Sequence, residues 1–258
     1  MKRSINALDR ILRGEATRPA VLRERGLDVP IGGLCLTVLL LAVFYGICMG
    51  FFAGFREGGP HFQQWLAGAV KTPALFVLTL AVTFPSLYVF NALVGSRLNL
   101  TAVVRLLIAS LAVNVALLAS LGPVVAFFSV STTSHSFVVV LNVLVFAVSA
   151  LFGFGFLLKT LHRLMAAQRL TTPADRDCEE PSETGPIEAQ LADRERLPDD
   201  RVKTLFTCWM IVTSLVGAQM TWVLRPLVGD GSGPFHWFSA RESNFFNGFL
   251  DILRGFYQ

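Results

Sequence analysis

The sequence predicts an all-α, polytopic membrane protein with five transmembrane helices and an interfacial amphipathic helix near each end. Hydrophobic residues make up 53% of the chain and charged residues only 16%, a composition too apolar for an ordinary soluble domain. Apolar runs long enough to cross a bilayer cover roughly 31–55, 71–97, 101–128, 134–158 and 204–224. Because these runs are continuous and do not alternate, we expect helices and not the strands of a barrel.

The distribution of charge predicts how the chain is oriented. Most of the 22 Lys and Arg residues precede the first run, follow the second, or occupy the loop after the fourth. Cytoplasmic segments retain such residues, so we expect a cytoplasmic N-terminus and an external or periplasmic C-terminus in the inner (plasma) membrane. The expected regions are a cytoplasmic amphipathic helix and linker (1–30), a four-span membrane bundle (31–160), a flexible cytoplasmic loop (161–203), a fifth transmembrane helix (204–226) and an external tail (227–258).

The first region and the first span each carry a helical pattern. Residues 4–13 form an amphipathic helix, which either lies on the cytoplasmic leaflet or docks on a partner. Gly46, Gly50 and Gly54 share one face of the first span, and small residues at this spacing let helices approach closely. The partner helix is either another span of this chain or a second copy. We expect an external connection from Arg56 to Lys71 to follow.

Polar and helix-bending residues occur inside the later spans. Pro85 removes a backbone donor and is expected to kink the second span. Such residues either line a cavity, as in transporters, or bond between helices, which we favour because no ionisable residue accompanies them. The intramembrane candidates are Thr83, Pro85, Tyr88, Asn91, Asn114, Pro123, Asn142 and Gln219.

The tail after the fifth span contains a second amphipathic segment. Arg225 and Pro226 end the span, and a helix from about Ser243 places Phe246, Phe249, Leu250 and Leu253 at helical spacing. We expect this helix at the external interface, or as a docking element for an external partner. The candidate docking residues are Arg225, Pro226, Asn244 and Phe246.

No motif for catalysis, a cofactor or a metal stands out. The four cysteines lack CxxC spacing, and the sequence holds no Walker loop, GxGxxG or Ser/His/Asp set. The net charge of +4 fits the positive-inside bias and contact with anionic lipid, not a nucleic-acid surface. We therefore expect no cofactor and no nucleic-acid partner.

The strings KTPALFVLTLAVTFPSLYVFNALVGSRL, VGAQMTWVLRPLVG and RESNFF resemble a set of poorly characterised bacterial inner-membrane proteins, and the topology resembles the five-span Yip1-like membrane proteins. That resemblance implies a membrane-organising factor that acts through partner proteins and carries no catalytic residues. The positions it singles out are Lys71, Pro73, Phe84, Pro85, Tyr88, Asn91, Gln219, Arg225, Pro226 and Asn244.

Together these features predict a non-enzymatic integral membrane subunit or scaffold. It would assemble in the inner membrane with a membrane protein partner, with a homo-oligomer left open. The alternative is a small channel or carrier whose path follows the kinked second and third spans, lined by Thr83, Tyr88, Asn91 and Asn114. An intramembrane enzyme acting on lipid ranks third, because no acid–base pair is visible.

Overall fold

The described part of the chain is entirely helical. The computed structural model describes residues 2–15, 17–18, 30–54, 62–93, 100–169, 199–228, 237 and 245–254. The helices are α1 (Lys2–Leu12), α3 (Ile31–Gly54), α4 (Phe62–Leu93), α5 (Leu100–Ser131), α6 (His135–Arg169), α8 (Asp199–Val223) and α9 (Phe245–Arg254). Five of them, α3 to α6 and α8, are long and apolar enough to cross a membrane, so the all-α, five-span prediction is confirmed.

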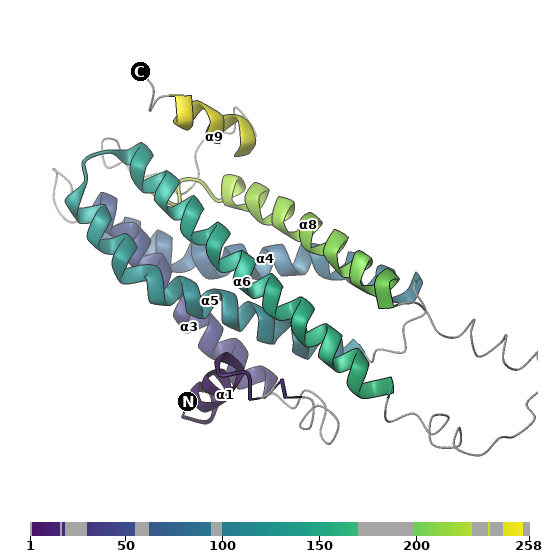
Figure 1. Ribbon diagram of the computed structural model, residues 1–258. Coiled ribbons are helices and arrows are strands. Elements are labelled where there is room, and N and C mark those ends of the chain that lie inside the picture. Colours follow the sequence, from purple (N-terminus) through teal and green to yellow (C-terminus); the bar gives the residue numbers. More distant parts are fainter. Residues whose placement is uncertain are drawn as a thin grey trace, which may run out of the picture.

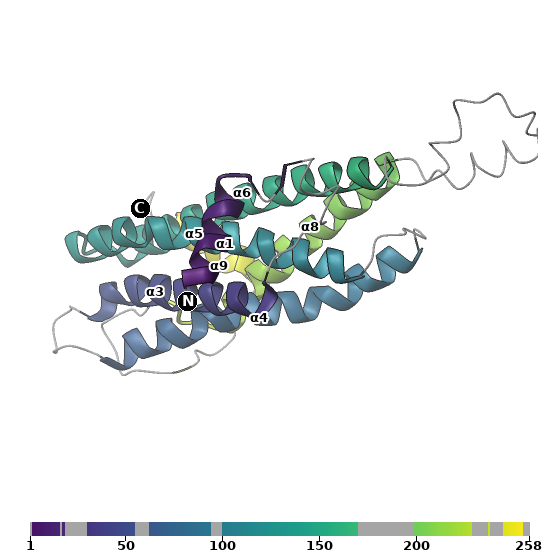
Figure 2. The same cartoon turned by 90° about the horizontal axis from the view of Figure 1, so that it is seen from below.

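The five long helices lie side by side, with a short helix at either end of the bundle (Figure 1). Helix α1 sits at the end where α3 begins, and α9 sits at the end where α8 stops; we call these the α1 end and the α9 end. Helix α3 packs against both α4 and α5, α5 packs against α6, and α4 packs against α8. The view from below shows this layering, with α3 between α4 and α5 at the α9 end of the bundle (Figure 2).

The glycines of α3 pack against α4 of the same chain. A Cβ atom added to Gly46 would overlap the backbone carbonyl of Gly68, and one added to Gly68 would overlap that of Gly46. Further along, Gly50 and Gly54 both face the side chain of Trp65. The backbones of α3 and α4 therefore approach closely, as small residues allow in membrane helices.

Helix α1 packs on its own bundle. Leu8 and Ile11 are buried in the apolar core of the α1 end, whereas Ile5 and Leu12 remain exposed. Gly14 stops the helix with a φ of 71°, a left-handed conformation that glycine adopts readily.

Three elements differ from their expected bounds: α4, α6 and α8, the last of which begins at Asp199, inside the loop expected over 161–203. Helix α4 starts at Phe62, so an external connection running as far as Lys71 is wrong: Lys71 is buried inside the helix. The segment stays in the bundle because its neighbours are apolar and because the carbonyl of Pro226 accepts a hydrogen bond from Lys71 Nζ. Helix α6 continues to Arg169, past the expected bundle boundary at 160. The loop predicted to be flexible falls, over 170–198, outside the described residues.

Candidate functional site

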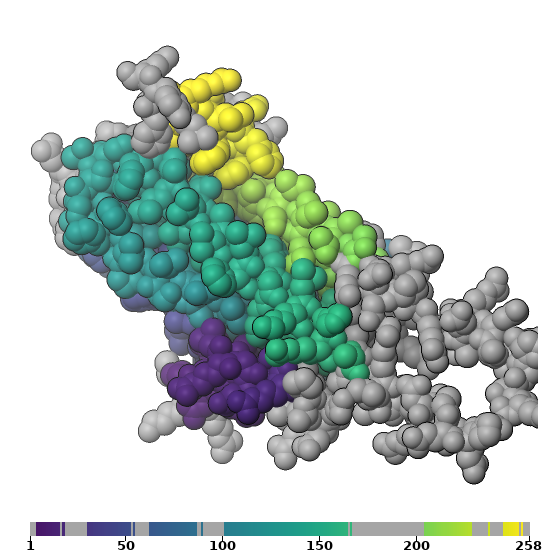
Figure 3. Space-filling model, viewed as in Figure 1, coloured from purple at the N-terminus to yellow at the C-terminus, as the bar shows by residue number. Residues whose placement is uncertain are grey.

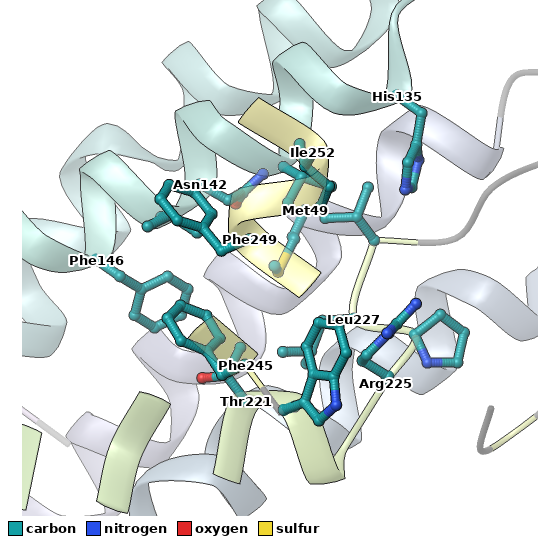
Figure 4. Close-up of a pocket in the computed structure, with 15 residues that line it drawn as sticks. Met49, His135, Asn142, Phe146, Thr221, Arg225, Leu227, Phe245, Phe249 and Ile252 are labelled. Carbon is teal, nitrogen blue, oxygen red and sulfur yellow. The ribbon is translucent and has the colours of Figure 1, made fainter. Parts of the chain in front are cut away.

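A cavity of about 350 Å³ opens at the α9 end, between α6, α8 and α9. Met49 of α3 contributes to its inner wall, and α9 covers the opposite side (Figure 4). The lining residues are Met49, His135, Val139, Asn142, Val143, Phe146, Thr221, Trp222, Arg225, Pro226, Leu227, Val228, Phe245, Phe249 and Ile252. Its size falls within the range of small-molecule sites, about 300–1,000 Å³.

The turn after α8 is fastened to α4 by two hydrogen bonds. The Nζ of Lys71 donates to the carbonyl of Pro226 at 2.9 Å, and the Nε2 of Gln64 donates to the carbonyl of Leu227 at 3.4 Å. Leu227 and Val228 are buried in the core of the α9 end. These contacts hold the turn, and with it Arg225, at the cavity.

Arg225 places a cation at the cavity wall. Its guanidinium carbon lies 3.9 Å from the centroid of the Trp222 ring, a distance at which a cation is attracted to the ring face. Partial burial lowers the pKa of Arg225 from its ordinary value, but an arginine remains protonated in proteins. Within the described ranges, no carboxylate forms a salt bridge with it.

Asn142 is held rigidly at the same cavity. The hydroxyl of Tyr45 donates to Asn142 Oδ1 at 2.9 Å, and Asn142 Nδ2 donates to the carbonyl of Val138 at 2.8 Å. Tyr45 is fully buried, and its ring meets Phe146 edge-on with centroids 5.5 Å apart. This pair is a bond between α3 and α6, which matches the interhelical interpretation of the intramembrane polar residues.

Helix α9 turns only part of its predicted apolar stripe toward the bundle. Phe245, Phe249 and Ile252 line the cavity, whereas Phe246 and Leu250 are about half exposed, at 48% and 49%. Phe245 and Phe249 stack with their centroids 5.9 Å apart. Phe246, a docking candidate for an external partner, therefore points away from the cavity, and its docking role stays a prediction.

A glycine contact sets how α9 packs on the bundle. Gly248 lies so close to the ring of Trp222 that a Cβ atom there would overlap it. This contact places Gly248 of α9 over the end of α8. In the space-filling view, α9 lies as a cap over the ends of α6 and α8 (Figure 3). Asn244, the remaining docking candidate, lies outside the described residues.

Of the four residues expected to line a path through the second and third spans, the structure describes the side chains of Thr83 and Asn114, which lie in different surroundings. Thr83 is buried and its hydroxyl bonds back to the carbonyl of Thr79 at 2.8 Å. Asn114 instead lines a separate cavity of about 90 Å³ between α4, α5, α6 and α8. The side chains of Tyr88 and Asn91 lie outside the described residues.

The Pro85 region of α4 is tied to α8. The indole Nε1 of Trp209 donates to the carbonyl of Thr83 at 3.1 Å, and the hydroxyl of Ser86 donates to the same carbonyl at 2.7 Å. Of the other intramembrane candidates, Gln219 is half-buried in α8. Pro123 is an exposed residue inside α5.

The larger cavity has walls suited to an apolar ligand with an anionic group. Its walls combine aromatic and aliphatic side chains with one cation, and no group of three or more His, Cys, Asp or Glu able to hold a metal occurs among the residues described. A comparison with protein-family models, with curated proteins and with solved structures finds no match for this chain. The resemblance to Yip1-like proteins stays a prediction.

Sequence reasoning singled out Arg225, Pro226 and Asn142 but missed most of the cavity. His135, Trp222 and Phe245 come together from three helices, and no local pattern links them. One signal was available: Lys71 stands within an otherwise apolar stretch, and a charge there needs a distant partner.

Proposed function

We propose that this chain is a non-enzymatic integral membrane subunit that assembles with a membrane protein partner through the exposed face of α8. The observation that carries the proposal is that the least buried of the five candidate spans is also the least hydrophobic. Helix α8 has the lowest mean hydropathy of the five candidate spans and is also the least buried, with 17% of its span buried against 61% in α5. A helix that faces lipid is expected to be apolar on the exposed side.

The exposed face of α8 is rich in small and polar side chains. Residues at helical spacing along it are Thr204, Thr207, Cys208, Ile211, Ser214 and Leu215. The hydroxyl of Ser214 donates to the carbonyl of Met210 at 2.9 Å, and Ile211 and Leu215 are the large side chains of this face. Small hydroxyl residues are enriched where membrane helices meet other helices, which favours a transmembrane helix of a partner over lipid at this surface.

The orientation belongs to the same proposal. The positive-inside bias puts the α1 end, with Lys2 and Arg10, at the cytoplasmic side of the inner membrane and α9 at the external side. The partner would then contact α8 within the bilayer, and both short helices would lie at the interfaces. A path for a solute through α4 and α5 has less support, because Thr83 and Asn114 face different surroundings.

Site-specific photocrosslinking in native membranes tests the proposal. A photoreactive amino acid is placed at Ile211 or Leu215 on the α8 face, and at Leu151 of α6 as a control with 72% exposure. We expect a discrete protein adduct from the two α8 positions and only lipid adducts from the control. An adduct of twice 28.3 kDa identifies the partner as a second copy.

A variant that alters the α8 face tests whether the crosslinked adduct depends on that face. Leu215→Trp adds bulk to the α8 face and is expected to abolish the adduct formed at Ile211, whereas Leu151→Trp leaves it intact. Lipid adducts alone from all three positions, or equal protein adducts from α6 and α8, would contradict a partner at this face.

A further inference from the structure

The geometry of the α9 end points to a binding site for an anionic amphiphile, an acyl chain ending in a carboxylate or phosphate, in the cavity between α6, α8 and α9. We propose that the apolar walls receive the chain and that Arg225 holds the anionic head. This inference is independent of the partner proposed for α8, because it rests on a different surface.

The depth of the cavity suits a chain. Met49 and Phe146 lie at its inner wall and belong to spans of the bundle, whereas Arg225 follows Val223, where the fifth candidate span ends. The cavity therefore runs from the level where a span ends into the apolar bundle. A ligand that fills it needs a polar end beside Arg225 and an apolar end beside Phe146.

The charge at the mouth favours an anion. Arg225 is the one cation among the described lining residues, and no carboxylate lines the cavity with it. Its guanidinium carbon lies over the Trp222 ring, and its N–H groups can donate to oxygen atoms of a ligand. Planar guanidinium groups bind carboxylate and phosphate in this way.

Two further polar side chains at the cavity bond within the protein. Asn142 is engaged with Tyr45 and Val138, and Thr221 donates back to the carbonyl of Gly217 at 2.9 Å. Both side chains already bond within the protein, whereas Arg225 is the described lining residue that carries a positive charge. Basic pockets between membrane helices are a recognised form of lipid head-group site.

Helix α9 completes the site as a cover. Phe245, Phe249 and Ile252 supply one wall. The close contact of Gly248 with Trp222 places that wall beside Trp222, whose ring also contacts Arg225. Figure 4 shows Phe249 and Phe245 turned toward Phe146 across the cavity. An acyl chain would lie between these rings.

Photolabelling of the full chain in nanodiscs of zwitterionic phosphatidylcholine tests the site. The probes are a fatty acid with a diazirine at its chain end, its methyl ester, and phosphatidylglycerol with the same chain. We expect the anionic probes to label Met49, Val143 or Phe146, the residues at the inner wall. Labelling by only one of the two anionic probes identifies whether the head is a free carboxylate or a phospholipid.

The charge dependence distinguishes a site from general lipid contact. Arg225→Gln is expected to raise the concentration for half-maximal labelling by the anionic probes about 10-fold or more, since it removes a charge-assisted hydrogen bond. Labelling by the methyl ester stays unchanged. The matched control is Arg254→Gln, which alters an exposed arginine of α9 that pairs with Asp251 and leaves labelling by every probe unchanged.

A second variant decides the case if Arg225→Gln misfolds. Val143→Trp fills the cavity from α6, away from the turn that carries Arg225, and is expected to abolish labelling of Phe146 by all probes. The proposal is overturned if the label falls on lipid-facing residues such as Leu151, or if Val143→Trp leaves labelling of Phe146 intact. Equal responses to Arg225→Gln and Arg254→Gln would overturn it as well.

Discussion

The contact between Gly46 and Gly68 predicts that a single methyl group on α3 destabilises the bundle. In Gly46→Ala the added Cβ would overlap the carbonyl of Gly68 and lie 2.8 Å from the hydroxyl of Thr72. The first of these neighbours is backbone and cannot move aside alone, so α3 and α4 must separate. Overpacking of this kind costs about 1–3 kcal/mol.

A second glycine isolates the steric part of that cost. Alanine is favoured over glycine in a helix interior by about 0.8–1.0 kcal/mol, which offsets part of the clash in Gly46→Ala. Gly155 of α6 has nothing within 4 Å of its added Cβ, so Gly155→Ala carries the propensity gain alone. The propensity contribution cancels between the two variants, and their unfolding free energies should differ by about 1–3 kcal/mol.

Unfolding in mixed micelles, followed by far-ultraviolet circular dichroism as the fraction of dodecyl sulfate increases, measures this difference. Gly155→Ala should unfold at an equal or higher detergent fraction than the unaltered protein, and Gly46→Ala at a lower one. The difference amounts to about 5-fold to 150-fold in the unfolding equilibrium constant. Equal midpoints for the two variants would refute a backbone contact between α3 and α4 at Gly46.

Two further predictions concern the bonds from α4 to α8 and to the turn that follows α8. Trp209→Phe removes the indole donor from the buried carbonyl of Thr83 and should lower the free energy of unfolding by about 0.5–1.5 kcal/mol, measured in the same micelle titration; no change would show that Ser86 alone satisfies that carbonyl. Lys71→Met retains the apolar stem but loses the bond to Pro226, so hydrogen exchange of the amides of 227–228 should accelerate with the bundle still folded. Unchanged exchange there would contradict a fastening role for Lys71.

The spans could be predicted from sequence because each depends on the composition of one continuous segment. Apolar length identifies a helix that crosses a bilayer, and this holds even in α4, which contains both Pro73 and Pro85. The start of α4 could not be predicted in the same way. Its first turns hold Gln64 and Lys71, which resemble a polar connection, and their acceptors lie 163 and 155 residues away in the chain.

The faces of the short helices show the same limit. Periodicity identified α1 and α9 as amphipathic, but an apolar stripe wide enough to include Phe245, Phe246, Phe249 and Leu250 does not say which edge turns inward. That choice depends on Gly248, which fits the ring of Trp222 from another helix. The cavity beside it combines side chains from four helices, so no single segment carries its pattern.

The contacts with α4 support both the exposed face of α8 and the cavity beside Arg225. Few residues of the α8 span are buried, and two directional bonds tie α8 and the turn after it to α4: Trp209 to Thr83, and Lys71 to Pro226 at the α9 end. A helix held by bonds on one side can leave its other side to a partner without losing its place. The same bonds hold the turn that presents Arg225. Loosening the contact between α4 and α8 should therefore weaken partner binding and amphiphile binding together, whereas a change confined to either surface should affect one alone.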